Sequence, residues 1–152
     1  MIQCEIVELQ PQAIAVVHEQ VPMTALASFF ARAFHAVMSA IGAQGVLPAG
    51  PPLGCYLGMP TDTVDVAAGF PVGRPITAVG DVTPMQLPGG RAVTTVHVGP
   101  FDTLTQTYAE LAAWMAAQGL QPAEMMWEVY LSDPQNQPDP ATWRTQIMWP
   151  VA

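Results

Sequence analysis

Two stretches of the chain alternate apolar and polar residues, and each is followed by a longer apolar stripe with a helical period. The alternating stretches are residues 13–19 and 91–98, and both are rich in β-branched side chains, which is typical of half-buried strands. The apolar stripes lie within residues 24–44 and 103–118 and predict two amphipathic helices. The stripe of the second helix consists of Leu104, Tyr108, Leu111 and Met115.

Two further strands are expected after each helix. They lie near residues 53–58 and 64–70 in the first half, and near 127–131 and 142–149 in the second. Asp102 or Thr103 is placed to cap the start of the second helix, and Gly119 stands where a helix commonly ends in a glycine. Residues 80–90, which contain several prolines and glycines, are expected to join the two halves.

Three segments of the first half recur in the same order in the second half. AIAVVH at residue 13 matches AVTTVH 79 residues later, and GVLPAGPPLGCYL at residue 45 matches GLQPAEMMWEVYL 74 residues later. AAGFPV at residue 67 matches QIMWPV, again 79 residues later. The sequence therefore predicts an α+β fold of two pseudo-symmetric β-α-β-β units, about 1–79 and 80–152, with a largely antiparallel sheet and two main helices.

Length and composition agree with one globular domain over residues 1–152. Hydrophobic residues make up 51% of the chain and charged residues only 11%, so much of the surface must be neutral or apolar. That composition favours an apolar groove or a partner rather than disorder.

The charge balance bounds the partners. Four arginines and no lysine stand against twelve acidic residues, for a net charge of −8. Direct binding of nucleic acid is excluded because it needs more cations than the chain has, and cationic or neutral small molecules are favoured. No stretch has the roughly 18 uninterrupted apolar residues of a membrane span, so we expect no membrane partner. The N-terminus lacks a basic signal region and Cys4 and Cys55 form no CxxC motif, so a cytoplasmic location is expected.

Glu128 is the leading candidate for a functional residue, because it interrupts the apolar strand MMWEVYL, where a carboxylate is costly unless it is solvated or paired. Strand alternation places Glu128 and Tyr130 on one face, opposite Trp127, Val129 and Leu131. In the first half, Leu53, Cys55 and Leu57 are expected on the helix-packing face. Gly54 and Tyr56 are then expected on the other face, where a pseudo-twofold axis sets them around one central groove with Glu128 and Tyr130.

Aromatic residues form a second group of candidates, because their faces attract cations and supply apolar area. Tyr56 and Tyr130 are expected to line the groove. Phe70 and Trp149 are candidate ligand contacts, although core packing is the simpler interpretation for them and for Trp143.

The histidines do not indicate a metal site. His18 and His97 take matching places in the two repeats, but no HxxxH, CxxC or carboxylate cluster accompanies them, so structural hydrogen bonding is favoured over metal binding. No phosphate-binding loop or nucleophile motif is present either. We expect neither a metal nor a cofactor.

The second half resembles the GyrI-like family, which includes effector-binding domains of AraC- and MerR-type multidrug regulators. The resemblance is carried by HVGPFDTLTQTYAELAAWMAAQGLQPAEMMWEVYLSDP, by the DP-x-x-W-R-T segment at residues 139–145 and by the final WPV. It implies two fused units, a groove that takes hydrophobic and often cationic molecules, and a functional glutamate at Glu128.

Three functions follow as alternatives. The first is small-molecule binding for sensing, sequestration or detoxification. The second, also implied by the family, is hydrolysis of cyclopropane-bearing toxins, with Glu128 as the base and Tyr130 assisting. The third is a protein-interaction role, with a transcription regulator or DNA gyrase as the partner.

Overall fold

A computed structural model describes residues 3–58, 61–132 and 138–151. The chain divides into two compact units, which are described separately below. Unit 1 comprises Met1–Leu9 and Gly90–Ala152, and unit 2 comprises Gln10–Gly89.

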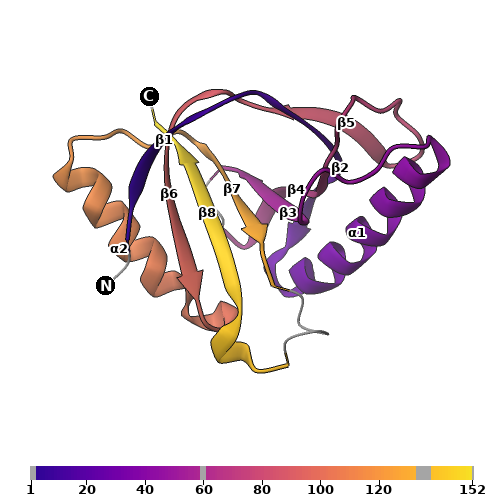
Figure 1. The fold of residues 1–152 in the computed structure, drawn as a ribbon. Coiled ribbons are helices and arrows are strands. Elements are labelled where there is room, and N and C mark those ends of the chain that lie inside the picture. The colour runs from indigo at the N-terminus through magenta and orange to yellow at the C-terminus, as the bar shows by residue number, and fades with distance from the viewer. Residues whose placement is uncertain (1–2, 59–60, 133–137, 152) are drawn as a thin grey trace. The chain divides into compact units, whose positions relative to one another are not determined.

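Unit 1 is a four-stranded antiparallel sheet with one main helix against it (Figure 1). The strands lie in the order β1-β6-β8-β7, with every pair antiparallel. The elements are β1 (Glu5–Leu9), β6 (Gly90–Val98), η2 (Phe101–Thr103), α2 (Leu104–Ala117), β7 (Met125–Tyr130), η3 (Pro140–Thr142) and β8 (Arg144–Pro150).

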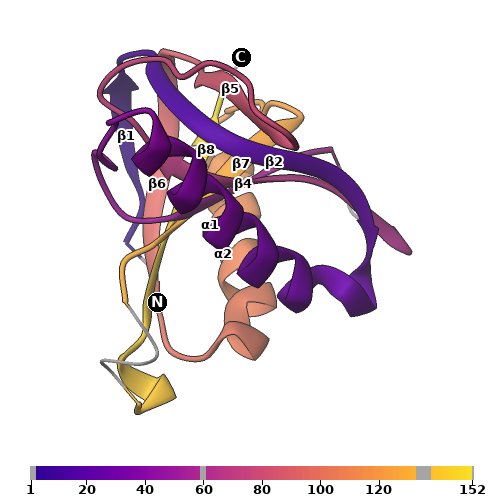
Figure 2. The same ribbon diagram turned by 90° about the vertical axis from the view of Figure 1, so that its right-hand side faces the viewer.

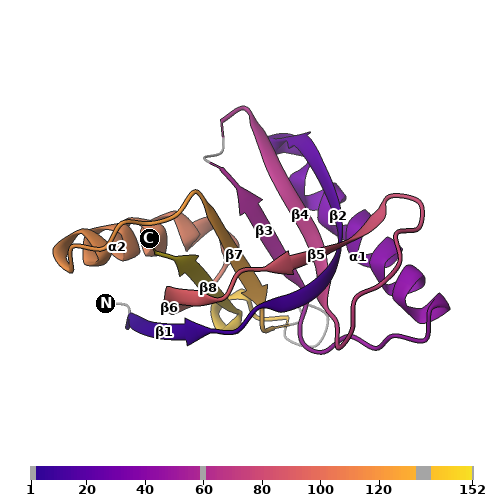
Figure 3. The ribbon, with the colours of Figure 1, turned by 90° about the horizontal axis from the view of Figure 1, so that it is seen from above.

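Unit 2 has the same topology. Its strands lie in the order β5-β2-β4-β3, again antiparallel, and α1 lies along β2 and β4 (Figure 2, Figure 3). The elements are β2 (Gln12–Pro22), η1 (Met23–Ala25), α1 (Leu26–Ala43), β3 (Leu53–Leu57), β4 (Thr63–Pro71) and β5 (Val82–Leu87). The predicted α+β class, antiparallel pairing and two main helices are confirmed.

The unit boundaries differ from the expected halves 1–79 and 80–152. The N-terminal strand β1 pairs with β6 and so belongs to the second half of the chain. Residues 80–90, expected only to join the halves, contain β5, which pairs with β2. Both strands are short and polar on alternate positions, and Pro84 lies inside β5, which is tolerated on an edge strand.

The two helices end as predicted and begin differently. Gly119 has a φ of 70°, and the amide of Leu120 donates to the Met115 carbonyl, which is the Schellman arrangement. No side chain caps the start of α2. Thr103 donates its hydroxyl proton to the Pro100 carbonyl instead, at 2.8 Å, so the prediction of a side-chain cap is wrong.

The core of unit 2 is formed where α1 meets β2 and β4. Phe29, Ala33 and Val37 of the helix are buried there. The segment Met23–Ala43 is long and apolar enough to span a membrane by length and composition alone, with a mean hydropathy of 1.3. A helix that buries one face in a protein core passes the same test, and the expectations of a cytoplasmic location and no membrane partner stay predictions.

Candidate functional site

The Glu128 carboxylate is the most unusual buried group in unit 1. Glu128 lies on β7 and is only 5% exposed. Tyr108 of α2 donates its hydroxyl proton to one carboxylate oxygen, and Tyr130 donates to the other at 2.9 Å. Hydrogen bonds to a charged group are the strong ones in proteins, so the two phenols offset part of the cost of burying the carboxylate.

Strand register and helix packing bring these three side chains together. Tyr130 follows Glu128 by two residues on the same strand, so the two side chains share a face. Glu128 lies opposite Ile147 of β8, which is completely buried. Tyr108 reaches the carboxylate from the helix, and its hydroxyl also lies 3.7 Å from the Met126 sulfur.

Aromatic rings surround the same part of unit 1. Trp149 of β8 packs edge to face on Tyr108, with ring centroids 6.2 Å apart. Phe101 lies 6.1 Å from Tyr130 and 5.1 Å from Trp143, and is itself 44% exposed. Of the predicted site residues, Glu128, Tyr130 and Trp149 are thus brought together. Trp143, expected in the core, joins them through Phe101.

The expected orientation of the sheet faces is wrong. Glu128 and Tyr130 share a face, as predicted, but that face packs against α2 rather than away from it, because Tyr108 of the helix contacts Glu128. The same holds in unit 2, where Tyr56 packs against the cluster that contains the buried face of α1. Cys55 lies on the opposite face and is also fully buried. Since both faces are buried here, alternation separates the faces without telling which one the helix covers.

The other predicted site residues lie in unit 2. Gly54 and Tyr56 belong to β3, where they lie opposite Ala68 and Val66 of β4. Phe70 of β4 packs against Phe34 of α1 with ring centroids 5.7 Å apart, and both contact the core cluster. Within unit 2 these residues share the helix-packing face. The groove expected between the two units stays a prediction.

Gly54 and Glu128 hold corresponding positions in the two sheets. Gly54 lies opposite Ala68, and Glu128 lies opposite Ile147, 79 residues later. Phe34 and Tyr108 correspond in the same way, 74 residues apart, and each packs edge to face on an aromatic residue of its own sheet. Tyr108 is the functional candidate that the sequence interpretation missed, because it was assigned to the apolar stripe of the helix. The replacement of a phenylalanine by a tyrosine at that repeat position was the available signal.

The two histidines are not equivalent. Val93 lies opposite Trp149, and Ala15 lies opposite Phe70, so the first strands of the units correspond with an offset of 78 rather than 79. A slip of one residue exchanges the faces of a strand. His18 accordingly lies exposed and pairs with Asp65 at 2.5 Å, whereas His97 is buried and faces α2. Both make hydrogen bonds, as expected.

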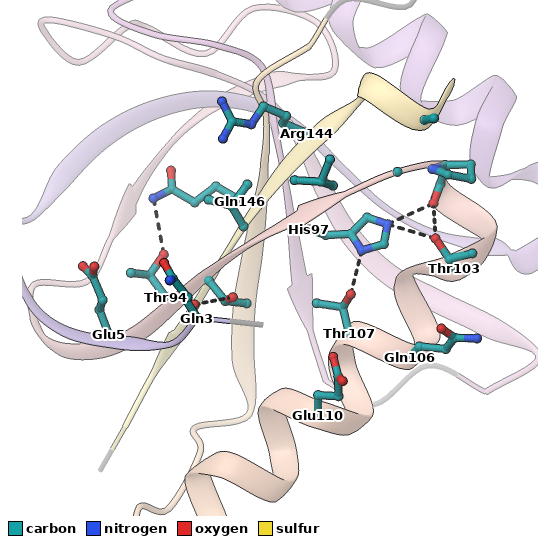
Figure 4. Close-up of a pocket in the computed structure, with 16 residues that line it drawn as sticks. Gln3, Glu5, Thr94, His97, Thr103, Gln106, Thr107, Glu110, Arg144 and Gln146 are labelled. Carbon is teal, nitrogen blue, oxygen red and sulfur yellow. Dashed lines mark hydrogen bonds between the residues drawn. The ribbon is translucent and has the colours of Figure 1, made fainter. Parts of the chain in front are cut away.

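A hollow of about 860 Å³ lies beside β6 and the first half of α2 (Figure 4). Its lining includes His97, Thr107, Glu110 and Arg144, and it contains none of the predicted site residues. In the part of the chain that the structure describes, no three histidine, cysteine or carboxylate side chains are grouped to hold a metal ion.

The chain is similar to several solved structures over almost its full length. It aligns with the EcmrR C-terminal domain at a TM-score of 0.85 and 20% identity, covering 100% of this chain and 98% of that one. In the EcmrR–DNA complex the TM-score is 0.87 with 22% identity; the alignment covers 99% of this chain, which spans 57% of that one.

Two further neighbours carry functional descriptions. SAV2435 bound to tetraphenylphosphonium aligns at a TM-score of 0.71 and 13% identity, covering 99% of this chain and 94% of that one. A hydrolase from Listeria innocua aligns at 0.67 and 19%, covering 99% and 92%. At these identities the likeness shows the fold. A comparison with curated proteins gave no match.

One family model covers nearly the whole sequence. It is described as the GyrI-like small molecule binding domain and matches residues 2–152. The chain therefore belongs to the GyrI-like family of small-molecule-binding domains.

Proposed function

We propose that this domain binds hydrophobic, cationic small molecules, and that Glu128 is the residue that selects the positive charge. The observation that carries the proposal is the buried Glu128 carboxylate, held by the hydroxyls of Tyr108 and Tyr130 among aromatic rings. Neutral donors stabilise a carboxylate less than a full opposite charge does. The neighbour SAV2435, of the same fold, is bound to tetraphenylphosphonium, which supports this ligand class.

The energetics favour a flat or propeller-shaped organic cation. Such a ligand buries apolar area against Trp149 and Phe101, and its charge is attracted both by the carboxylate and by aromatic faces. Its delocalised charge costs less to dehydrate than an ammonium group, so more of the Coulomb energy is retained. The net charge of −8 adds a long-range attraction. We expect micromolar affinity, about −8 kcal/mol.

Titration of Glu128→Gln tests the proposal. Quenching of the tryptophan fluorescence is followed with tetraphenylphosphonium and with triphenylphosphine oxide, a neutral molecule of related shape. The substitution should weaken the cation by about tenfold or more, which is roughly 1.4 kcal/mol, and leave the neutral ligand nearly unchanged. Glu110→Gln on α2 is the matched control, because it removes the same charge at an exposed position. Equal losses for both ligands in Glu128→Gln contradict charge selection.

Hydrolysis of a strained electrophile is the second candidate, because Glu128 with Tyr130 also forms an acid–base pair. In that case Glu128 takes the proton of an attacking water and a tyrosine hydroxyl stabilises the developing negative charge. Incubation with a cyclopropane-bearing alkylating agent, followed by mass spectrometry, separates the candidates. Multiple turnovers that Glu128→Gln abolishes establish catalysis, and ring opening at the uncatalysed rate leaves a binding protein.

A protein-interaction role is the third candidate, with a transcription regulator or DNA gyrase as the partner. The acidic surface is the feature that favours it. A supercoiling assay with purified gyrase tests the second partner. Inhibition at stoichiometric protein that survives Glu128→Gln displaces small-molecule binding as the main function.

A further inference from the structure

His97 joins the first strand of unit 1 to the helix that carries Tyr108. It lies on β6 and is 5% exposed. Its Nδ1 atom is 2.6 Å from the Thr107 hydroxyl, and its Nε2 atom is 3.0 Å from the Pro100 carbonyl oxygen (Figure 4). A carbonyl can only accept, so Nε2 carries a proton and donates it. In the neutral ring Nδ1 then accepts from Thr107.

This link stands where a helix cap is missing. No side chain caps the start of α2, and Thr103 bonds to Pro100 and lies 3.1 Å from His97 Nε2. Only three residues of α2 are buried, and Thr107 is the one nearest its start. The other two, Leu111 and Met115, attach the later turns through apolar contacts. The hydrogen bond from Thr107 to His97 is therefore the polar attachment of the first turns.

Tyr108 is the residue next to Thr107, so the two share one helical turn. Successive residues of an α-helix are rotated by a fixed angle, so holding Thr107 also holds the direction in which Tyr108 leaves the helix. A helix rotation of about 10° moves a side-chain tip by roughly 1 Å. That displacement exceeds the whole usual range of hydrogen-bond lengths, and it is enough to separate Tyr108 from Glu128.

Unit 2 has a tie at the corresponding place. Glu19 of β2 is the counterpart of His97 when the strands are aligned with the offset of 78, and it accepts two hydrogen bonds from Arg32 of α1, at 2.7 and 3.1 Å. Each unit thus joins its first strand to its helix at one register position. In unit 2 the tie is an exposed ion pair, and in unit 1 it is a buried hydrogen bond beside the candidate site.

We propose that His97 is a positioning residue, which acts through Thr107 to hold the Tyr108 hydroxyl on the Glu128 carboxylate. It thereby sets the affinity for an organic cation without touching the ligand. This inference rests on the proposed function for its effect on affinity, whereas the effect on Tyr108 does not depend on any ligand.

Thr107→Val and Thr107→Ser test the inference in the full chain labelled with fluorotyrosine. The sequence has three tyrosines, so ¹⁹F NMR gives three resonances, and Tyr108→Phe assigns the one that matters. Valine keeps the shape of threonine but removes the hydroxyl, so the Tyr108 resonance of Thr107→Val should shift or broaden. Its affinity for tetraphenylphosphonium should fall about three- to tenfold. Serine restores the hydroxyl, and both readouts should return to the wild-type values within twofold.

Variants of His97 separate its two hydrogen bonds. The asparagine amide occupies the place of Nδ1, so His97→Asn should retain the Thr107 contact and the Tyr108 resonance. The glutamine amide reaches the place of Nε2, so His97→Gln should retain only the Pro100 contact and resemble Thr107→Val. Gln106→Ala, an exposed change one residue away, is the control and should move neither readout. If a His97 variant fails to fold, the Thr107 pair alone decides.

The proposal is overturned if Thr107→Val leaves the Tyr108 resonance where it is, or if serine does not restore it. Should the wild-type protein not bind tetraphenylphosphonium, the proposed function fails while the resonance still tests the positioning role.

Discussion

Tyr108 and Trp149 meet edge to face with their ring planes at 77°, and Phe34 and Phe70 meet in the same way at 64° in the other unit. The helix and sheet positions of the two pairs correspond. The units therefore share one packing scheme and differ in chemistry, because unit 1 adds a phenol hydroxyl at Tyr108 and a carboxylate at Glu128, where unit 2 has Phe34 and Gly54. Polar chemistry is built on one copy of an otherwise apolar arrangement.

The hydroxyl of Tyr108 and the carboxylate of Glu128 should be energetically coupled. Tyr108→Phe removes a donor to a buried charge and should lower the free energy of unfolding by about 1.5–3 kcal/mol. The same change made in Glu128→Gln should cost clearly less, because the acceptor is then neutral. Urea unfolding of the two single variants and the double variant gives the coupling energy. A coupling energy near zero contradicts the charge-assisted bond.

Thr145 and Thr95 should respond in opposite ways to the same substitution. Both are buried on the face of unit 1 that packs against α2. The Thr95 hydroxyl donates to the Gln3 carbonyl at 2.7 Å, whereas the Thr145 hydroxyl has no hydrogen-bond partner among the described residues. An unsatisfied buried hydroxyl costs about 1–3 kcal/mol. Thr145→Val should therefore raise the melting temperature and Thr95→Val should lower it, by calorimetry.

Destabilisation by Thr145→Val at a level similar to Thr95→Val identifies a water or a bound molecule as the partner of the Thr145 hydroxyl. A water that bridges buried groups is nearly as good as a direct hydrogen bond, so its loss is measurable.

Cys55 should be silent towards thiol reagents in the folded protein. Burial, with a smaller effect of the Asp65 charge, raises the pKa of the Cys55 thiol to about 12, so the reactive thiolate is scarce at pH 8. Cys4 is partly exposed and should be alkylated first. Mass spectrometry after iodoacetamide treatment, with and without denaturant, should show one modified cysteine and then two.

The same shift gives stability a dependence on alkaline pH. The pKa of Cys55 is higher in the folded than in the unfolded chain, so its contribution is fully present below about pH 8.5, the ordinary thiol value. It is lost as the pH rises towards the folded value of about 12, with a slope of up to about 1.4 kcal/mol per pH unit. Cys55→Ala should flatten this part of the curve in urea unfolding, and an unchanged slope contradicts the assignment.

Gly69 should not tolerate a side chain. A Cβ atom added there would lie 1.8 Å from the Ala15 carbonyl oxygen on the neighbouring strand β2. The obstacle is backbone, which cannot move without breaking the pairing of β2 and β4. Gly69→Ala should therefore lower the urea midpoint strongly, and Gly73→Ala, where nothing lies within 4 Å, is the control. Similar midpoints for the two variants contradict the close approach.

The arrangement of helices and strands was largely predictable, because each unit has a clear change of period from two to 3.6. The edge strands were not, since β1 and β5 have no apolar run of their own and gain their order from pairing with β6 and β2. Edge strands are decided by backbone partners that lie far away in the sequence.

The candidate site was predictable in part. Glu128 is conspicuous because a carboxylate interrupts an apolar strand, and Tyr130 follows from alternation. Tyr108 was not found, because a tyrosine in a helical stripe has the pattern of a core residue. The choice of face failed for a related reason: Cys55 and Trp127 on the far face are as buried as the face towards the helix, so hydrophobicity alone does not distinguish the two.

The shared topology of the two units has a consequence for how this protein can change. In unit 2 the helix and sheet meet through apolar contacts that hold that unit together, so most substitutions there are felt as a loss of stability. In unit 1 the matching positions carry Tyr108, Glu128 and Trp149, whose replacement alters what is recognised. Evolution of ligand preference is thereby confined to one copy, while its counterpart preserves the scaffold under purifying selection.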